Sequence, residues 1–181
     1  MNNPAALAGW LPYVPPHAKS YHPWLVDRGS LTRRLQERCA AFQVEPVRQV
    51  LRPSLSDERW LLRAPAGEWL TTREVFLCCA DTPVVFAHSV VRRGGLKGPW
   101  RWVGGLGARP LGAALFADPR IERTPLAFRA IGRHHPLFGC ATARLELRPN
   151  VLWARRSIFL REAVPLMVTE VFLPTILELP R

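Results

Sequence analysis

Cysteine is scarce in this sequence, and its spacing matches neither a disulfide framework nor a metal site. The four cysteines are Cys39, Cys78, Cys79 and Cys140, and no two of them form a CxxC pair. The opening residues show no secretory signal pattern. We therefore expect reduced core thiols in a cytoplasmic protein, and we expect neither a metal ion nor a cofactor.

Long hydrophobic runs and acidic residues are lacking as well. No apolar run is long enough to span a membrane, so stable membrane insertion is not expected. The chain has 14 acidic residues against 25 lysines and arginines, which gives a formal net charge of +11. This excess favours a solvated basic surface, an anionic ligand or nucleic acid. Because the arginines are scattered and no nucleic-acid-binding motif appears, we do not expect a nucleic-acid partner.

The residues that are present describe an ordinary globular chain. Its 181 residues are 48% hydrophobic, which suits one domain with a real core. Residues 1–20 contain four prolines and no sustained period, so we expect a flexible N-terminal tail followed by a single domain over 21–181.

Branched and aromatic residues predict about six strands, and most of them are joined by short turns. The expected strands are 45–51, 69–79, 84–91, 121–131, 153–161 and 166–173, with a loop over 52–67. Short helices are expected in pairs within 22–39 and 100–116, and one more over 136–147. This pattern indicates an α+β fold with an antiparallel sheet.

Two charged residues stand inside expected strands. Glu170 lies in a strand whose apolar residues fill both alternation phases, so its carboxylate needs a partner charge or a hydrogen bond. A neighbouring-strand arginine such as Arg156 could supply a structural ion pair, and a ligand could use the carboxylate instead. Arg73 shares a strand face with Val75 and Leu77. The adjacent His134 and His135 diverge and have no third ligand at useful spacing, so we interpret them as loop histidines.

Five motifs in order resemble the chorismate lyase family, from about residue 22 to residue 177. They are Ser-Leu-Thr-x-Arg at 30–34, Trp-Leu-x-x-Arg-Glu-Val-Phe-Leu-Cys at 69–78, Arg-Pro-Leu-Gly-x-x-Leu-Phe at 109–116, Trp-x-Arg-Arg-Ser at 153–157 and Thr-Glu-Val-Phe-Leu-Pro at 169–174. The resemblance implies a single antiparallel sheet with helices on one side and two helix-turn-helix flaps over an enclosed site. It implies a monomer that eliminates pyruvate from chorismate, giving 4-hydroxybenzoate for ubiquinone synthesis.

The resemblance also implies which residues contact the substrate. Leu31, Arg73, Leu111 and Glu170 match the family's ligand contacts by position. Arg73 and Glu170 would be the catalytic pair, with Arg73 binding a carboxylate and Glu170 close to the hydroxyl and the enolpyruvyl ether. Some family members carry arginine where this chain has His88. A second substrate carboxylate would then need His88 as a cation, or one of the three arginines Arg92, Arg93 and Arg156.

The chemistry of the substrate supports such a site. Chorismate is a dianion, so its site needs two fixed cationic donors. Glu170 could protonate the departing enolpyruvyl group, and a flap-covered site predicts slow product release. Two alternatives stay open. The same fold serves as the effector-binding domain of bacterial transcription regulators, although those carry an added DNA-binding domain. A basic nucleic-acid-binding module is the other.

Overall fold

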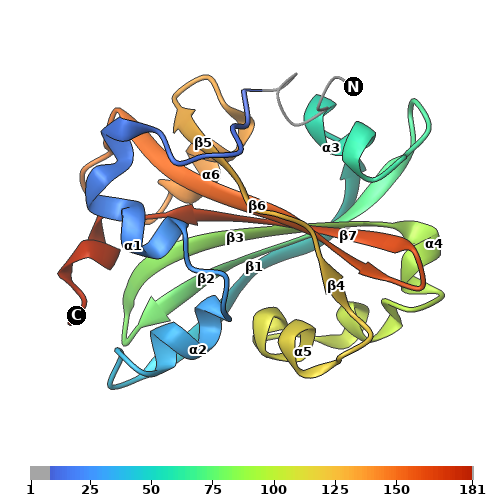
Figure 1. The fold of residues 1–181 in the computed structure, drawn as a ribbon, viewed down its shortest axis with the longest axis horizontal. Coiled ribbons are helices and arrows are strands. Elements are labelled where there is room, and N and C mark those ends of the chain that lie inside the picture. The colour runs from blue at the N-terminus through green and yellow to red at the C-terminus, as the bar shows by residue number, and fades with distance from the viewer. Residues whose placement is uncertain (1–8, 181) are drawn as a thin grey trace.

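The structure is a computed structural model that describes residues 9–180, and its centre is one antiparallel sheet (Figure 1). Within these residues the sheet has seven strands in the order β1-β2-β3-β7-β6-β4, and β5 pairs with β6 beyond this path. The strands are β1 (Phe42–Pro53), β2 (Trp69–Cys79), β3 (Thr82–Arg92), β4 (Glu122–Arg123), β5 (Ala127–Gly132), β6 (Val151–Arg161) and β7 (Val164–Phe172). The predicted α+β class with an antiparallel sheet is confirmed.

Two hairpins and one long-range pairing build the centre of this sheet, from β2 to β6. Ala80 joins β2 to β3, and Glu162 with Ala163 joins β6 to β7; all three adopt positive φ. Tight hairpin turns often require this left-handed backbone, because it follows the natural twist of the strands. β7 then pairs with β3 as well as with β6, so the last strand of the chain lies near the centre of the sheet.

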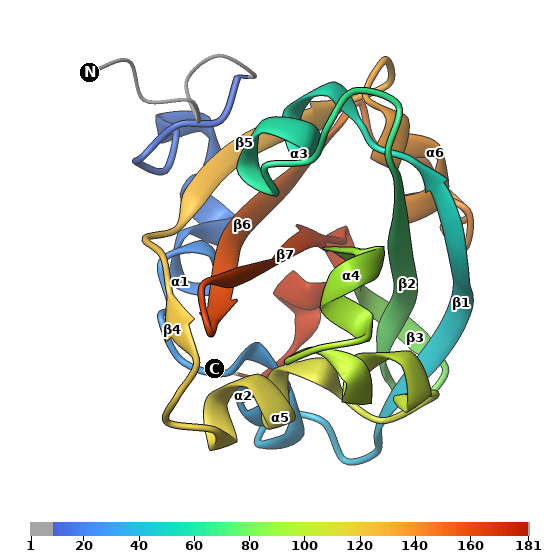
Figure 2. The same cartoon turned by 90° about the vertical axis from the view of Figure 1, so that its right-hand side faces the viewer.

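Helices cover both faces of the sheet, whereas the resemblance implied helices on one side only. One face carries α3 (Ser56–Leu61) and α6 (Pro136–Ala141), which pack with Trp10 on an apolar cluster that includes Phe76 and Phe86. The other face carries α1 (His22–Leu25), α2 (Leu31–Gln36), α4 (Arg93–Leu96), the 3-10 helix Arg101–Gly105 and α5 (Leu111–Ala117). Figure 2 shows the sheet bent strongly, with α2 and α5 side by side at its lower end.

The N-terminal segment differs from the expected tail. Residues 1–8 lie outside the described residues. Residues 9–20 are packed on the domain rather than loose: Trp10 is buried, Leu11 bridges Phe128 of β5, and a 3-10 helix spans Pro16–Tyr21. Trp10 is large and apolar, and its indole N–H finds an acceptor in Asp57, so burial at this point is favourable.

Three element boundaries also differ. The expected loop over 52–67 contains α3, whose first turn carries Asp57 and Glu58. The expected strand over 121–131 is interrupted, because Pro125 lies between β4 and β5 and cannot donate to a ladder. α6 ends at Ala141 rather than near residue 147.

Two of the four cysteines are joined and two are free. The structure joins Cys39 to Cys79 in a disulfide and leaves Cys78 and Cys140 free, so the expectation of four reduced thiols is wrong for the first pair. Among the helices of residues 9–180, none has the length and apolar character needed to cross a bilayer.

Candidate functional site

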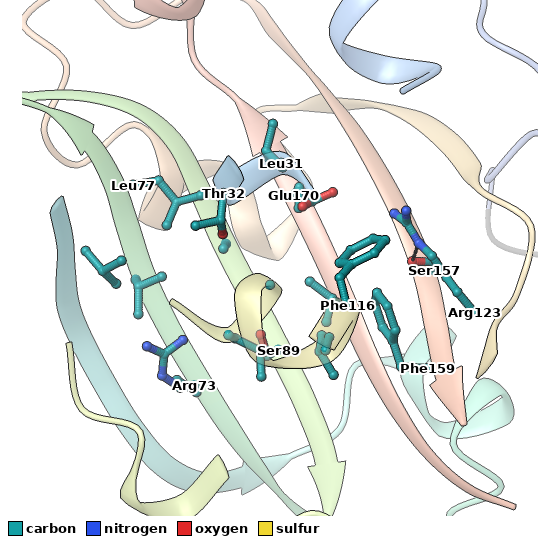
Figure 3. Close-up of a pocket in the computed structure, with 17 residues that line it drawn as sticks. Leu31, Thr32, Arg73, Leu77, Ser89, Phe116, Arg123, Ser157, Phe159 and Glu170 are labelled. Carbon is teal, nitrogen blue, oxygen red and sulfur yellow. Dashed lines mark hydrogen bonds between the residues drawn. The ribbon is translucent and has the colours of Figure 1, made fainter. Parts of the chain in front are cut away.

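A narrow cavity lies between the sheet and two helical segments (Figure 3). We call residues 22–36, with α1 and α2, the first flap, and residues 101–117, with the 3-10 helix and α5, the second flap. The cavity is small, with a volume of about 40 Å³. The flaps therefore lie close to the sheet, and a ring-sized ligand needs them to move apart.

The floor of the cavity is a row of residues in register across four strands. Arg73 of β2 lies opposite Ser89 of β3, Ser89 lies opposite Val168 of β7, and Val168 lies opposite Ser157 of β6. All four line the cavity, as does Glu170, two residues along β7 from Val168. Because side chains alternate along a strand, Arg73 and Glu170 are on the same face of the sheet.

Arg73 joins the sheet to the second flap. Its side chain is almost fully buried, and Nη2 donates to the main-chain oxygens of Gly107 (2.8 Å) and Arg109 (3.1 Å). It makes no ion pair with a carboxylate in residues 9–180. Burial of the charged guanidinium lowers the pKa of Arg73 to about 10. Such a buried, unpaired cation is well suited to bind an anionic ligand.

Glu170 forms an ion pair with Arg155 on the neighbouring strand β6, and not with the expected Arg156. Arg155 lies opposite Glu170 in the register, and its Nε donates to Oε2 of Glu170 at 2.5 Å. Arg155 is fully buried, and its Nη1 donates to the main-chain oxygens of Trp24 and Asp27 in the first flap. The Glu170 side chain keeps 15% of its surface exposed, on the cavity side. The ion pair therefore orients a carboxylate that a ligand can still reach.

Leu31 and Leu111 come from the two flaps and cover the cavity. Each is the first residue of a short helix: Ser30 caps α2 by accepting a hydrogen bond from the N–H of Arg33, and Pro110 precedes α5. Both leucines are buried and line the cavity. Four predicted site residues, Leu31, Arg73, Leu111 and Glu170, therefore meet in one place.

His88 does not line the cavity, which corrects our expectation for this residue. It lies next to Ser89 on β3 and so points to the opposite face, where its Nδ1 is 2.9 Å from Glu74 Oε1 and its Nε2 is 2.7 Å from Glu58 Oε1. Burial disfavours the charged imidazole, but the hydrogen bonds and charges of Glu58 and Glu74 outweigh it and raise the pKa of His88. This histidine bridges two carboxylates and belongs to the packing of α3 on the sheet.

The three arginines proposed as substitutes for His88 are engaged or directed elsewhere. Arg156 is on the same face as His88, and its Nη1 donates to Asp57 at 2.7 Å. Arg92 pairs with Glu68, and Arg93 is exposed at the start of α4. None of them is among the residues that line the cavity.

Arg123 is the cavity residue that our sequence reasoning missed. It belongs to the two-residue strand β4, and its Nε donates to Ser157 Oγ at 2.9 Å. Its guanidinium carbon lies 5.3 Å from the ring centroids of both Phe116 and Phe159. The available signal was its position two residues before Pro125, because proline interrupts strands. We instead read residues 121–131 as one continuous strand.

The paired histidines have a structural explanation. His135 accepts a hydrogen bond from the N–H of Leu137 and caps α6, while burial and the charge of Arg129 lower the pKa of His135 to about 4. Within residues 9–180, no group of three or more His, Cys, Asp or Glu side chains is arranged so that it could hold a metal ion.

Solved structures share the fold at low sequence identity. The effector domain of PhnF from Mycobacterium smegmatis superposes with a TM-score of 0.55 at 12% identity, covering 81% of this chain and 89% of that chain. A transcriptional regulator of the GntR family from Bacillus cereus gives a TM-score of 0.51 at 8% identity, covering 74% and 92%. These likenesses confirm that the fold is shared with effector domains of regulators, and at such identities they show the fold alone.

Sequence comparisons point to one family. The family model described as chorismate lyase matches residues 8–179. A protein of Nitrosomonas europaea named "Probable chorismate pyruvate-lyase" is 51% identical over 158 residues, which cover 87% of this chain and 89% of that protein. A protein of the same name from Nitrosospira multiformis is 46% identical over 181 residues, covering 98% and 99%. The chain belongs to the chorismate lyase family, whose members are carbon–oxygen lyases.

Proposed function

We propose that this protein eliminates pyruvate from chorismate and releases 4-hydroxybenzoate, which then serves ubiquinone synthesis. The observation that carries the proposal is the meeting of Arg73 and Glu170 in one flap-covered cavity, in a chain of this family. Chorismate offers a ring carboxylate for Arg73 and a ring hydroxyl for Glu170. The reaction itself breaks the ether bond between the ring and the enolpyruvyl group.

The atoms of this reaction balance without a co-reactant. The ring loses the proton on the carbon that bears the hydroxyl, and the ring electrons become aromatic as the ether bond breaks. The methylene carbon of the released enolpyruvyl group gains a proton and becomes the methyl group of pyruvate. The protein therefore has to position the substrate, exclude water and assist one proton transfer.

The ion pair with Arg155 supports an acceptor role for Glu170. We hypothesised from the sequence that Glu170 protonates the leaving group, which needs a neutral carboxyl. A carboxylate bound to a buried guanidinium is instead suited to accept a hydrogen bond from the ring hydroxyl and to receive the ring proton. Arg155 fixes the direction of this carboxylate through Oε2, and the other oxygen, Oε1, has no hydrogen-bond partner within residues 9–180 and can accept from the substrate.

The decisive experiment is incubation of the purified protein with chorismate, with coupled detection of pyruvate and chromatographic detection of 4-hydroxybenzoate. We expect equal amounts of both products. Glu170→Gln removes the negative charge at nearly constant shape, so we expect turnover to fall about 100-fold or more. Full turnover in this variant would remove Glu170 from the mechanism. As a control, Glu37→Gln changes an exposed carboxylate just after the first flap, where it pairs with Arg33, and its turnover should match the wild type.

The fold shared with effector domains of regulators favours a second candidate function, in which the protein binds a small molecule without converting it. This candidate predicts that chorismate or 4-hydroxybenzoate binds and that no pyruvate appears. The expected monomeric state and the cytoplasmic location remain predictions. Sedimentation of the purified protein and fractionation of cells would check them.

A further inference from the structure

We infer that Arg123 binds the second carboxylate of the substrate, the one on the enolpyruvyl group; this rests on the proposed function. A dianion needs a second fixed cation besides Arg73. Among the described residues that line the cavity, Arg73 and Arg123 are the two cations. His88, Arg92, Arg93 and Arg156 all lie outside it, as described above.

Arg123 is held in place on several sides. Its Nε donates to Ser157 Oγ and its Nη1 donates to the main-chain oxygen of Arg28 in the first flap, each at 2.9 Å. Phe116 of the second flap and Phe159 of β6 lie against the guanidinium. Within residues 9–180 its Nη2 has no hydrogen-bond partner. A fixed guanidinium with a free N–H suits a carboxylate, since the ordering cost is already met.

Arg73 and Arg123 lie at opposite ends of the cavity floor, as Figure 3 shows. Arg73 begins the in-register row across the sheet, and Arg123 bonds to Ser157, which ends it. Three strand spacings separate the Cα atoms of Arg73 and Ser157, or about 14 Å. The two guanidiniums therefore lie on opposite sides of the cavity, as a ligand with two separate carboxylates requires. Glu170 belongs to the strand between them, where the ring hydroxyl and the ether bond would lie.

The charges around the cavity agree with this assignment. Glu170 is already neutralised by Arg155, whereas Arg73 and Arg123 make no ion pair with a carboxylate in the described part of the chain. Burial lowers the pKa of Arg123, as it does that of Arg73. Arg73 is buried and Arg123 is half-buried. Two cations removed from water in this way without a paired carboxylate are costly, and a ligand with two carboxylates removes that cost.

The product allows the two arginines to be tested separately, because 4-hydroxybenzoate keeps the ring carboxylate and lacks the enolpyruvyl one. For Arg123→Gln we expect the KM for chorismate to rise about tenfold or more. The Kd for 4-hydroxybenzoate, measured by calorimetry, should stay within about twofold of the wild type. Arg73→Gln should weaken both. The matched control is Arg33→Gln, which changes an exposed flap arginine and should alter neither value.

Two outcomes overturn the inference: an unchanged KM for chorismate in Arg123→Gln, or an equal loss of affinity for substrate and product. If Arg123→Gln fails to fold, Arg123→Lys and Ser157→Ala give the same comparison, because each disturbs the guanidinium while keeping a cation. Wild-type turnover is measured first and tests the proposed function alone. A wild type that binds chorismate without converting it still permits the comparison by Kd.

Discussion

Three arginines of the sheet bind the flaps through main-chain oxygens, and two of them, Arg73 and Arg123, also line the cavity. Arg73 donates to Gly107 and Arg109 of the second flap, while Arg123 donates to Arg28 and Arg155 donates to Trp24 and Asp27 in the first flap. Hydrogen bonds from charged donors contribute more than neutral ones. At the scale of the residue, the groups that would bind the substrate are therefore also the groups that hold the flaps down.

The buried His88 should make stability depend on pH. Its raised pKa in the folded protein means that folding favours the protonated form. This contribution is complete below about pH 6.5, the value for unfolded histidine, and is lost as the pH rises through the folded pKa. We expect the free energy of unfolding of the wild type to fall over this window relative to His88→Gln, which cannot carry the charge.

Urea unfolding of both proteins at a series of pH values measures this difference. Near about pH 6, His88→Gln should cost about 1–3 kcal/mol, because Glu58 and Glu74 lose a charged donor between them. The cost should shrink as the pH rises. A constant difference between the two proteins at all pH values would contradict the prediction.

The alternation of side chains between the two faces of a strand explains which site residues could be predicted from the sequence. Alternation along β2 and β7 correctly places Arg73 and Glu170 within buried strands, and hairpin register then decides which residues face them. Arg73 pairs with Ser89, so the neighbouring His88 points away; Glu170 pairs with Arg155, so Arg156 points away. Register depends on turn geometry, which the sequence alone left open. Arg123 was hidden because its strand is only two residues long.

At the scale of the element, the two flaps meet at a glycine. A Cβ added to Gly112 of α5 would lie 2.8 Å from Thr32 Oγ1 of α2, which is closer than real contacts allow. Both Gly112 and Thr32 line the cavity. Small size at position 112 is therefore what allows the flaps to close on each other.

Gly112→Ala should loosen the flaps and speed product release. We expect the Kd for 4-hydroxybenzoate to rise about 5- to 30-fold, since about 1–2 kcal/mol of overpacking has to be relieved by displacement of the flap. If release limits the reaction, kcat should rise or stay constant.

Stopped-flow displacement of bound 4-hydroxybenzoate measures the release rate directly. Gly104→Ala is the matched control, because a Cβ there meets nothing within 4 Å. An unchanged release rate in Gly112→Ala would show that contact between the flaps does not govern opening.

The bounds of an element could be predicted from the sequence where branched and aromatic residues fill a strand. They could not be predicted where hydrogen bonds at the first turn determine whether a short helix forms. The strand over 69–79 was predicted with its true bounds, because branched and aromatic residues fill it. α3 was missed although Glu58 accepts a hydrogen bond from the N–H of Leu55 and stabilises its first turn. Ser56, Asp57 and Glu58 in sequence were the available signal, since acidic residues favour helix starts.

At the scale of the whole molecule, the net charge of +11 should act on a doubly negative substrate. A positive protein attracts such a ligand over a distance comparable to the Debye length, about 10 Å at 0.1 M salt. We expect the KM for chorismate to rise about two- to fivefold between low and high salt, with kcat nearly constant.

Steady-state measurement of KM and kcat over a series of salt concentrations checks this. Chloride and acetate salts are both used, so that the effect of ionic strength can be distinguished from competition by a particular anion. Urea unfolding at the same salt concentrations verifies that the fold is unaffected. A KM independent of salt would show that the scattered arginines do not steer the substrate. The α+β architecture, by comparison, could be predicted from the patterns of strand and helix residues in the sequence.

The use of main-chain oxygens as the flap partners of Arg73, Arg123 and Arg155 has an evolutionary consequence. A backbone carbonyl is supplied by any amino acid, so flap sequences can drift among relatives without losing these contacts. The three guanidiniums have no such freedom, because lysine cannot reproduce their planar fork. Engineering of altered specificity should therefore vary the flaps first and leave the sheet arginines intact.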